Sequence, residues 1–216
     1  MKWLSGNCRK GNKLSEYHKI ETLYERDLAT FKVKAGVFKN PIYDELKRWH
    51  WTEKIDGTNI RVIWRDGKVT FGGKTDNAQI NADLIRYLYE EFTADALSAA
   101  FPDANDVVLY GEGYGAGIQK GGDYCDSKRF ILFDVLVAGK WWLSDANVQD
   151  VASKLDIDVV PDFGMMTLEE ATELVRDGFP SRIGTAKAEG LVGRPLEALF
   201  DKKGSRLIVK LKTKDF

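Results

Sequence analysis

The dipeptide Asp66-Gly67 stands between two short runs rich in β-branched and aromatic residues, Ile60 to Trp64 and Lys68 to Phe71. Because both residues tolerate the positive φ angles of a two-residue turn, this arrangement predicts a β-hairpin. Gly139-Lys140, after the apolar run Phe130 to Val137, offers a second turn of the same kind. Hairpins commit a chain to antiparallel pairing, so we expect sheets that are largely antiparallel.

Further strands are predicted where apolar residues are bounded or interrupted by polar ones. Val107 to Tyr110 and Ile157 to Val160 are short apolar runs, as is typical of buried strands. The last segment, Arg206 to Lys212, alternates along its length. One face is expected to join the core and the other to carry cations: the first consists of Leu207, Val209 and Leu211, the second of Arg206, Ile208, Lys210 and Lys212.

Helices are predicted from apolar spacing and from capping residues. Apolar residues recur every three to four positions from Ile80 to Phe101, which predicts one amphipathic helix packed on a sheet. Ser144 and Thr167 have the character of N-caps, and Glu170 strengthens the second. Asp177-Gly178 marks the end of the helix that Thr167 begins.

Strands dominate and no regular βαβ rhythm appears, so the pattern favours a mixed α+β fold over a doubly wound one. With 216 residues, 44% of them hydrophobic, the chain fits a single domain, residues 1–216. Residues Gly111 to Gly122 hold six glycines in twelve positions and are expected to form a mobile loop over a site. They lack the Gly-Lys-Ser/Thr of a Walker phosphate-binding loop.

The formal net charge is −1, from 32 basic and 33 acidic residues, so any contact with nucleic acid must be local. Only two cysteines occur, Cys8 and Cys125, and neither forms a CxxC pair or a zinc cluster with His18 and His50. Met1 to Lys13 lack the apolar stretch of a secretory signal, and no window approaches the roughly 20 apolar residues of a membrane span. These features indicate a soluble protein in a reduced, cytoplasmic setting, without a membrane partner.

Five short segments with chemically capable side chains follow one another between Lys54 and Lys212. In chain order they are Lys54-Ile55-Asp56-Gly57 with Asn59, Tyr110-Gly111-Glu112-Gly113, Phe133-Asp134, Glu189-Gly190-Leu191-Val192 and Val209-Lys210-Leu211-Lys212. The series resembles the covalent nucleotidyltransferase superfamily, which comprises polynucleotide ligases and messenger-RNA capping enzymes. Within it the closest resemblance is to ATP-dependent, phage-type RNA ligases of the second kind. Thr58-Asn59 favours them, because DNA ligases typically place Arg at the second of these positions.

The resemblance implies a nucleotidyltransferase (ligase adenylation) domain of antiparallel sheets flanked by helices, similar to ATP-grasp folds. It also implies an ATP-dependent RNA ligase that works in three steps. Lys54 displaces pyrophosphate from ATP and carries AMP as a phosphoramidate, the AMP passes to a 5′-phosphate, and a 3′-hydroxyl then displaces it. Asn59 is expected to act in the later steps, near the activated end.

The same resemblance places charged residues around the phosphates. To attack phosphorus, Lys54 must be neutral at some moment, and a lysine with a pKa of about 10.4 rarely is. Lys210 and Lys212 would supply a positive field that favours the neutral form and would neutralise the triphosphate. Glu112 and Glu189 are expected to hold Mg²⁺ or Mn²⁺, directly or through the metal's own waters, with Glu189 also taking part in catalysis.

Other residues are expected at the base and the ribose. Phe133 would stack on adenine, Glu53 beside the nucleophile would help read the base, and Ile55 is expected among the residues that bind the nucleotide. Lys74 stands twenty residues after Lys54, where the family commonly has Arg near the ribose. Lysine keeps the charge but lacks the planar fork of arginine, so the chain departs from the family pattern here.

Structural interpretations stand beside these functional ones. A lysine before Asp56-Gly57 also fits a solvated turn, and the lysines of the last strand fit protection of a sheet edge. Phe133 fits a core position in an alternating strand, and a glutamate beside glycine fits an ordinary surface residue. For the whole protein, the alternatives are a minimal DNA ligase, a GTP-using capping-type enzyme, and a non-catalytic nucleic-acid-binding protein.

The partners implied are RNA ends in nicked or broken RNA, with nicked duplex RNA or DNA left open. The sequence stops four residues after Lys212, whereas family members usually continue into an oligonucleotide-binding (OB) fold or a helical domain. No separate C-terminal OB domain is therefore expected, and a partner protein that supplies substrate binding is compatible with that. Compactness is compatible with RNA repair by a phage enzyme in the host-cell cytoplasm.

Overall fold

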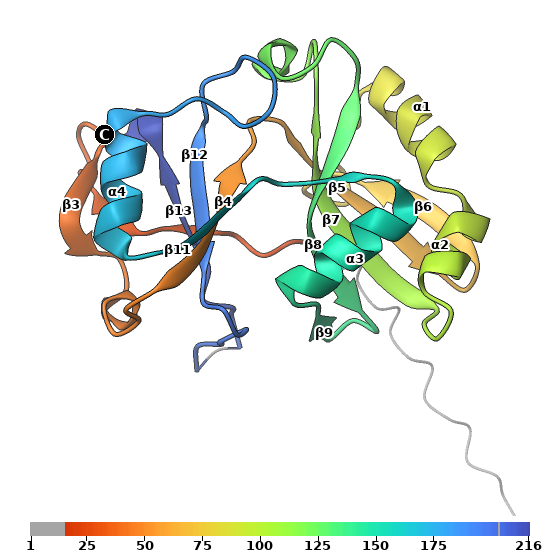
Figure 1. Cartoon of the computed structure of the whole chain (residues 1–216), viewed down its shortest axis with the longest axis horizontal. Coiled ribbons are helices and arrows are strands. Elements are labelled where there is room, and N and C mark those ends of the chain that lie inside the picture. The colour runs from red at the N-terminus through yellow and green to blue at the C-terminus, as the bar shows by residue number, and fades with distance from the viewer. Residues whose placement is uncertain (1–15, 203) are drawn as a thin grey trace, which may run out of the picture.

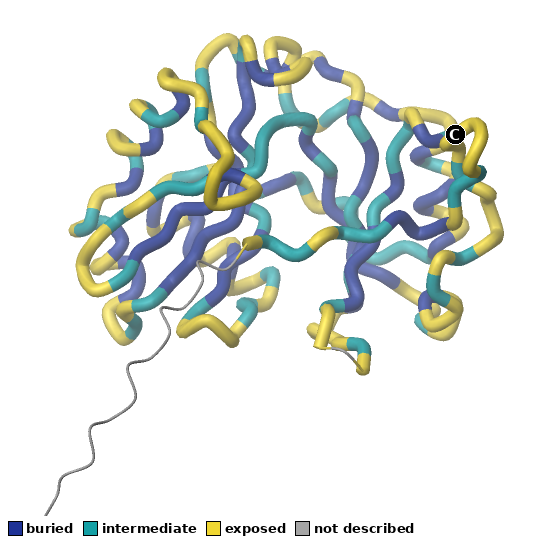
Figure 2. The backbone as a smooth tube through the Cα atoms, turned by 180° about the vertical axis from the view of Figure 1, so that it is seen from behind, coloured by how far each residue is buried: buried dark blue, intermediate teal, exposed yellow. Residues whose placement is uncertain are grey.

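Two β-sheets lie side by side, each with its own helices and its own hydrophobic core (Figure 1). The computed structural model describes residues 16–202 and 204–216, so Cys8 and Met1 to Lys13 lie outside the described residues. Seen from behind, the strands are buried over much of their length, and exposed residues gather in loops and outer turns (Figure 2).

The first sheet has five strands in the order β1-β13-β12-β4-β11. Helix α4 packs on it, beginning at the capping box predicted from Thr167 and Glu170 and ending before Gly178, as predicted. A ribbon of two strands, β2 and β3, adds Tyr24 and Phe38 to the same core. The bounds are β1 Glu21–Thr22, β2 Tyr24–Arg26, β3 Val33–Phe38, β4 Trp49–Lys54, β11 Asp162–Met166, α4 Leu168–Asp177, β12 Gly190–Arg194 and β13 Val209–Lys212.

The second sheet has six strands, in the order β10-β8-β7-β5-β6 with β9 paired to β8. Helices α1, α2 and α3 bury their apolar residues against it. The bounds are β5 Thr58–Arg65, β6 Lys68–Gly72, α1 Ala82–Glu91, α2 Ala94–Ala100, β7 Asp106–Tyr114, β8 Arg129–Val137, β9 Trp141–Trp142, α3 Asp145–Leu155 and β10 Asp158–Val159. Short 3-10 helices lie at Pro41–Tyr43, Gly121–Asp123 and Thr213–Asp215.

The predicted antiparallel character is confirmed. Asp66 and Gly67 adopt φ angles of 49° and 74° in the turn of the β5–β6 hairpin, and Gly139 has a φ of 66° in the turn between β8 and β9. Among the described strands only the β1–β13 and β8–β10 pairs are parallel. Ser144 caps α3 as predicted, accepting a hydrogen bond from the backbone N–H of Asn147. The fold is therefore mixed α+β.

The prediction of one helix from Ile80 to Phe101 is wrong. The chain leaves the helical conformation at Phe92, and the Thr93 side chain then caps α2 by accepting a hydrogen bond from the backbone N–H of Ala96. The break lets Phe92, which is 2% exposed, turn into the core. Apolar periodicity continues across the break and conceals it.

The glycine-rich segment Gly111 to Gly122 is a loop only in part, because Gly111 and Gly113 lie within β7. A Cβ atom on Gly111 would stand 2.2 Å from Cζ of Phe130, so glycine there permits close packing of β7 on β8. One on Gly115 would stand 1.9 Å from the carbonyl oxygen of Ser127. These glycines serve close approach of two chain segments rather than an open loop.

The last strand is shorter than the predicted Arg206 to Lys212, because β13 begins at Val209 and Arg206 forms only an isolated bridge with Phe200. Its predicted apolar face is confirmed: Leu207, Val209 and Leu211 all lie in the core of the first sheet. The predicted strand Ile157 to Val160 is likewise reduced to its two central residues.

Candidate active site

A cavity of about 370 Å³ lies where β4 of the first sheet ends and the chain crosses to β5 of the second. This volume falls in the ordinary range of small-molecule sites. Every predicted site residue except Glu189 lines it, and Glu189 contacts two residues that do. The lining residues that were predicted are Glu53, Lys54, Ile55, Asn59, Lys74, Glu112, Phe133, Lys210 and Lys212.

Glu189 joins two lysines from different strands. Nζ of Lys54 lies 2.5 Å from Oε2 of Glu189, and Nζ of Lys212 lies 2.5 Å from Oε1. The register explains this, because Gly190 stands opposite Lys54 in the β4–β12 pair and opposite Lys212 in the β12–β13 pair. Burial would raise the pKa of the Glu189 carboxyl, but the two ammonium groups outweigh burial and hold that pKa below its ordinary value.

Lys210 lies on the same face of β13 as Lys212. Burial, with repulsion from Lys212 and Lys54, lowers the pKa of Lys210 from 10.5 to about 8. Protection of a sheet edge does not account for these lysines, since β13 is flanked by β1 and β12. A buried cluster of cations is a favourable environment for a phosphate anion.

Glu112 and Asn59 lie on neighbouring strands and face each other in the β5–β7 register. Burial raises the pKa of Glu112 from 4.5 to about 8; Lys54 opposes this shift, and Glu189 and Asp56 add to it. Oδ1 of Asn59 is buried and has no hydrogen-bond partner among the described residues. A bound ligand can supply the missing partner of Asn59, and a bound cation would favour the charged form of Glu112.

The carboxylates fit a hydrated divalent cation better than a closed metal site. Among the residues that the structure describes, no group of three or more His, Cys, Asp and Glu side chains is arranged to hold a metal ion. Mg²⁺ is commonly held by one or two carboxylates together with its own waters and substrate phosphates. Glu112 and Glu189 offer two such carboxylates, and a cation near them would offset the repulsion that raises the pKa of Glu112.

The apolar side of the cavity includes Phe133, Ile55 and Val160. Phe133 is half-buried: it packs against two hydrophobic clusters and also lines the cavity. The ring of Tyr17 meets it edge-on, with ring centroids 5.1 Å apart. Phe133 therefore contributes to the hydrophobic core and also lines the cavity, so its structural and functional interpretations do not exclude each other.

Glu53 lines the cavity, but its carboxylate is already engaged. Only 1% exposed, it accepts hydrogen bonds from Oγ of Ser181 at 2.5 Å and from the backbone N–H of Arg182 at 3.0 Å. The carboxylate therefore anchors residues 181–182 to β4, a role that no local sequence pattern indicates. Lys74 is exposed and lies at the cavity's rim.

One wall that the motifs did not identify is formed by Tyr17, His18, Lys19 and Ile20. Of the segment Ile20 to Tyr24, which leads into β1 and β2, only Ile20 lines this cavity. Burial, reinforced by Arg206, lowers the pKa of His18 to about 4, so its ring is neutral, and its Nε2 is buried without a partner among the described residues. In the sequence, the adjacent aromatic residues Tyr17 and His18 were the feature that could have indicated this wall.

Asp134, predicted together with Phe133, does not line the cavity. It is fully buried and accepts hydrogen bonds from the Tyr17 hydroxyl at 2.8 Å and from Nη1 of Arg206 at 2.5 Å. These contacts hold the wall around Tyr17 against β8. Asp134 is therefore a supporting residue of the site.

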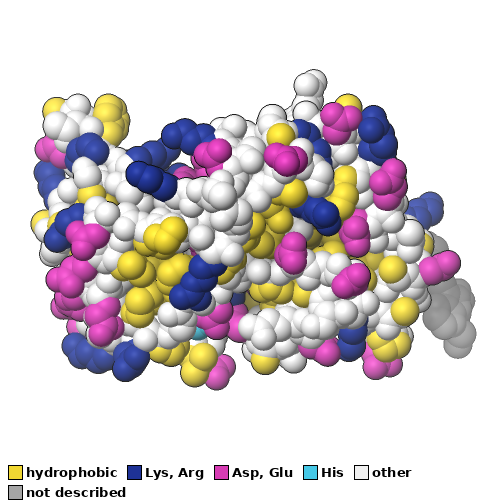
Figure 3. Space-filling model, turned by 45° about the horizontal axis from the view of Figure 1, so that its top comes forward, with side chains coloured by type: hydrophobic (Ala, Val, Ile, Leu, Met, Phe, Trp, Pro, Cys, Tyr) yellow, Lys and Arg dark blue, Asp and Glu magenta, His cyan; other side chains and the backbone are white. Residues whose placement is uncertain are grey.

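The face shown in Figure 3 carries acidic and basic side chains interspersed, as expected for a chain with a net charge of −1. Within the described ranges, no helix combines the length and the apolar character needed to cross a membrane.

The fold is similar to that of solved RNA ligases from Naegleria gruberi. A mutant with ATP and Mn superposes with a TM-score of 0.66 at 20% identity, covering 94% of this chain and 59% of that one. A mutant with AMP and Mn gives 0.65 at 19%, with coverage of 94% and 59%, and the ligase with PPi gives 0.63 at 20%, with coverage of 99% and 63%. The chain thus spans less than two thirds of the length of these proteins, and at this identity the likeness shows the fold.

The family comparison covers the whole series of motifs. The model of the RNA ligase family matches residues 47–212, a range that contains Lys54, Glu112, Glu189 and Lys212. Because this match extends over more than half of the sequence, the chain belongs to the RNA ligase family.

Proposed function

We propose that this protein is an ATP-dependent RNA ligase that forms a lysyl-AMP intermediate on Lys54. The observation that carries the proposal is the contact of Lys54 and Lys212 with opposite oxygens of Glu189, each at 2.5 Å, beside the cavity between the sheets. The carboxylate fixes the position of the Lys54 ammonium group and lies within reach of its proton. Membership of the RNA ligase family supports the same activity.

In the first step, Nζ of Lys54 attacks the α-phosphorus of ATP, so that an N–P bond forms and the bond to pyrophosphate breaks. Nζ gives up its protons in forming the phosphoramidate, and Glu189 is the nearest acceptor. The ammonium groups of Lys210 and Lys212 neutralise the charge that develops on the leaving pyrophosphate. Phe133 and Ile55 provide the apolar surface for adenine.

Glu112 and Glu189 would hold a divalent cation, Mg²⁺ or Mn²⁺, through its waters. When bound, that cation supplies further positive charge beside the phosphates. The N. gruberi ligases with a similar fold were solved with Mn together with ATP or AMP, which supports the assignment.

In the later steps, AMP passes from Lys54 to the 5′-phosphate of an RNA end, and the 3′-hydroxyl of a second end displaces it to form the phosphodiester. Asn59 brings an unpaired, buried Oδ1 to the same cavity and would contact the activated end. Nicked or broken RNA is the proposed substrate. Lys74 at the rim would contact the ribose of the nucleotide.

The decisive experiment is incubation with α-labelled ATP or GTP and Mg²⁺ or Mn²⁺, followed by a denaturing gel and intact mass. We expect an adduct one AMP heavier, formed from ATP by the wild type and by a Lys68→Ala control on the β5–β6 hairpin, but not by Lys54→Ala. Thermal unfolding of Lys54→Ala checks that its loss is chemical. An adduct from GTP alone would point to the capping-type alternative. If the folded wild type formed no adduct, the non-catalytic nucleic-acid-binding protein would be the remaining interpretation.

A further inference from the structure

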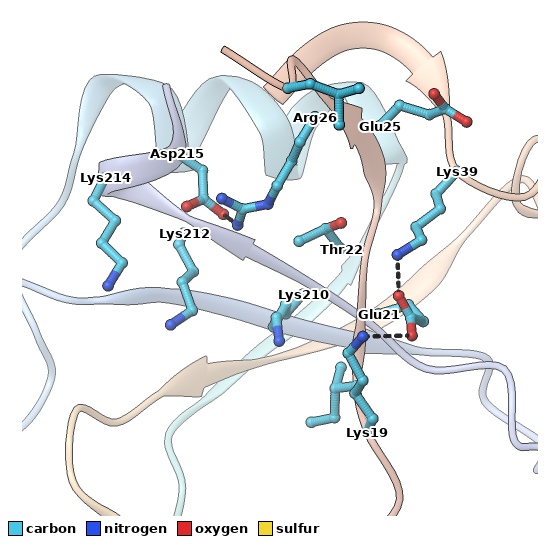
Figure 4. Close-up of a pocket in the computed structure, with 12 residues that line it drawn as sticks. Lys19, Glu21, Thr22, Glu25, Arg26, Lys39, Lys210, Lys212, Lys214 and Asp215 are labelled. Atoms are coloured by element: carbon cyan, nitrogen blue, oxygen red, sulfur yellow. Dashed lines mark hydrogen bonds and ion pairs between the residues drawn. The ribbon is translucent and has the colours of Figure 1, made fainter. Parts of the chain in front are cut away.

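A second cavity, of about 600 Å³, adjoins the nucleotide cavity (Figure 4). The two share four lining residues, Lys19, Ile20, Lys210 and Lys212, so Lys212, which contacts Glu189, also lines this second space. We call it the basic groove, after the cationic residues that line it: Lys19, Arg26, Lys39, Lys210, Lys212 and Lys214.

The basic groove is locally positive, although the whole chain is slightly negative. Six basic residues line it against three acidic ones, Glu21, Glu25 and Asp215, a local excess of three positive charges, whereas the whole chain has a net charge of −1. The carboxylate of Glu25 points away from the lysines (Figure 4). The groove therefore has the local positive character that contact with nucleic acid requires in this protein.

The acidic residues hold the cations in place without cancelling them. Lys19 lies 3.4 Å from Oε1 of Glu21, and Lys39 pairs with Oε2 of the same carboxylate, so two ammonium groups share one negative charge. Arg26 forms a one-to-one ion pair with Asp215, which holds it in position. Ordered cations lose less side-chain entropy when an anion binds.

Most of the added cations come from outside the segment that the family model matches. That match begins at residue 47, whereas Lys19, Arg26 and Lys39 belong to or flank strands β1 to β3. The polypeptide before β4 thus adds a wall to the ligase domain, and the cations on that wall face Lys210 and Lys212.

The size and chemistry of the groove point to a polymeric anion. Its volume of about 600 Å³ exceeds that of the cavity between the sheets, about 370 Å³, and it extends on both sides of the shared lysines, to Lys39 on one side and to Lys214 on the other (Figure 4). Lys210 and Lys212, two residues apart on one strand face, are spaced by about 6.6 Å, comparable to successive phosphates of an extended strand. Leu28, 90% exposed, offers an apolar contact for an unstacked base.

From this we infer that the basic groove binds the phosphodiester backbone of the RNA strand whose 5′-phosphate receives AMP, with the terminal phosphate at Lys210 and Lys212. The inference rests on the proposed function. Because these two lysines belong to both cavities, a terminal phosphate there is next to Lys54, while Lys39 and Lys214 flank it on opposite sides of the groove (Figure 4).

The test is the double variant Lys39→Gln/Lys214→Gln, with Lys68→Gln/Lys154→Gln on the second sheet and α3 as the matched control. Binding of 5′-phosphorylated single-stranded RNA is measured by fluorescence anisotropy without ATP, over a series of salt concentrations. We expect the groove variant to bind at least tenfold more weakly, and its salt slope to fall by at least about 0.7, the value for one phosphate contact removed. The control should bind like the wild type.

Lysyl-AMP formation separates this inference from the proposed function. The groove variant should form lysyl-AMP at the wild-type rate and with an unchanged KM for ATP, while AMP transfer to RNA falls with binding. If the groove variant binds RNA as tightly as the wild type does, the inference is overturned. If its KM for ATP is raised at the same time, the groove binds the triphosphate of ATP instead. Absence of lysyl-AMP from the wild type would instead overturn the proposed function, whatever the binding data show.

Discussion

Asn59 and Glu112 face each other across the antiparallel pair β5–β7, and both line the cavity between the sheets. Oδ1 of Asn59 is buried without a partner among the described residues, and burial raises the pKa of Glu112 to about 8. Lys54 and Lys212, in contrast, both form ion pairs with the single carboxylate of Glu189. The site therefore has ion pairs around Glu189 on one side, and on the other an unpartnered amide oxygen and a buried carboxyl group that a ligand can contact.

Replacement of Asn59 by Ala should separate the steps of the proposed reaction. Since Oδ1 has no hydrogen-bond partner within residues 16–202 and 204–216, we expect the variant to fold and to form lysyl-AMP within about twofold of the wild-type rate. Sealing of 5′-phosphorylated RNA should fall about tenfold or more, because one hydrogen bond to the activated end is lost. Rates of adduct formation and of sealing are measured separately, with exposed Asn147→Ala as the control. Equal losses in both steps would contradict this division.

Much of the site was accessible from the sequence because its residues occur in short motifs on strands. Once β4, β12 and β13 pair in register, Lys54, Glu189 and Lys212 must meet. The partner of Arg206 was not accessible: strand alternation placed it on the cationic face, whereas it is buried on Asp134, 72 residues away. An ion pair of that separation leaves no trace in a local pattern.

The helix break shows a second limit of local patterns. Thr93 carries a capping side chain that was visible in the sequence, yet the spacing of apolar residues runs through Phe92 without interruption. Periodicity reports which residues face the core, and both helices bury theirs in the same core, including Leu88 and Leu97. The periodicity therefore identifies the shared core but not the break.

Metal-free binding of ATP should weaken as the pH rises through about 8. Above that pH Lys210 loses its positive charge and Glu112 gains a negative one, since the pKa of each is about 8. Both changes disfavour a triphosphate, with an effect of up to about tenfold per pH unit for each group. Calorimetric titration of ATP across this range measures it, and Lys210→Met and Glu112→Gln should each flatten the curve. An affinity that stays constant in the wild type would contradict the assignment of these two groups.

His50 should make stability depend on pH in the opposite sense from His18. Nδ1 of His50 lies 2.7 Å from Oδ2 of Asp145, an ion-pair contact without hydrogen-bond alignment, and Nε2 lies 2.8 Å from Oδ1 of Asp162. Asp145 is the main cause of a raised pKa for His50, burial opposes it, and Asp162 adds to it. Because the folded pKa exceeds the unfolded value of about 6.5, the ion pairs stabilise the fold fully below that pH and are lost as the pH rises through the folded pKa.

Urea unfolding of the wild type and His50→Gln at about pH 6 and pH 9 tests this. The wild type should exceed the variant in free energy of unfolding by more at the lower pH. His18, whose folded pKa is about 4, provides the matched comparison: because the unfolded chain takes up its proton first, His18→Gln should gain on the wild type as the pH falls. The same sign for both variants would refute the two assignments.

Gly190→Ala should damage stability and chemistry together. A Cβ atom at Gly190 would lie 1.9 Å from the carbonyl oxygen of Leu211 and 2.8 Å from Cα of Lys212, so β12 and β13 would have to separate. We expect a loss of about 3 kcal/mol in unfolding free energy, as for other overpacked sites. Since Glu189 precedes this residue, the displacement would also draw its carboxylate from Lys212 and slow lysyl-AMP formation per folded molecule.

The control is Gly139→Ala, because Gly139 has a positive φ but a Cβ atom there would meet nothing within 4 Å. This variant isolates backbone strain and should lower the free energy of unfolding by about 1–2 kcal/mol without affecting the reaction. Equal losses of stability for the two variants would mean that strain, and not the contact with β13, sets the requirement for glycine at 190.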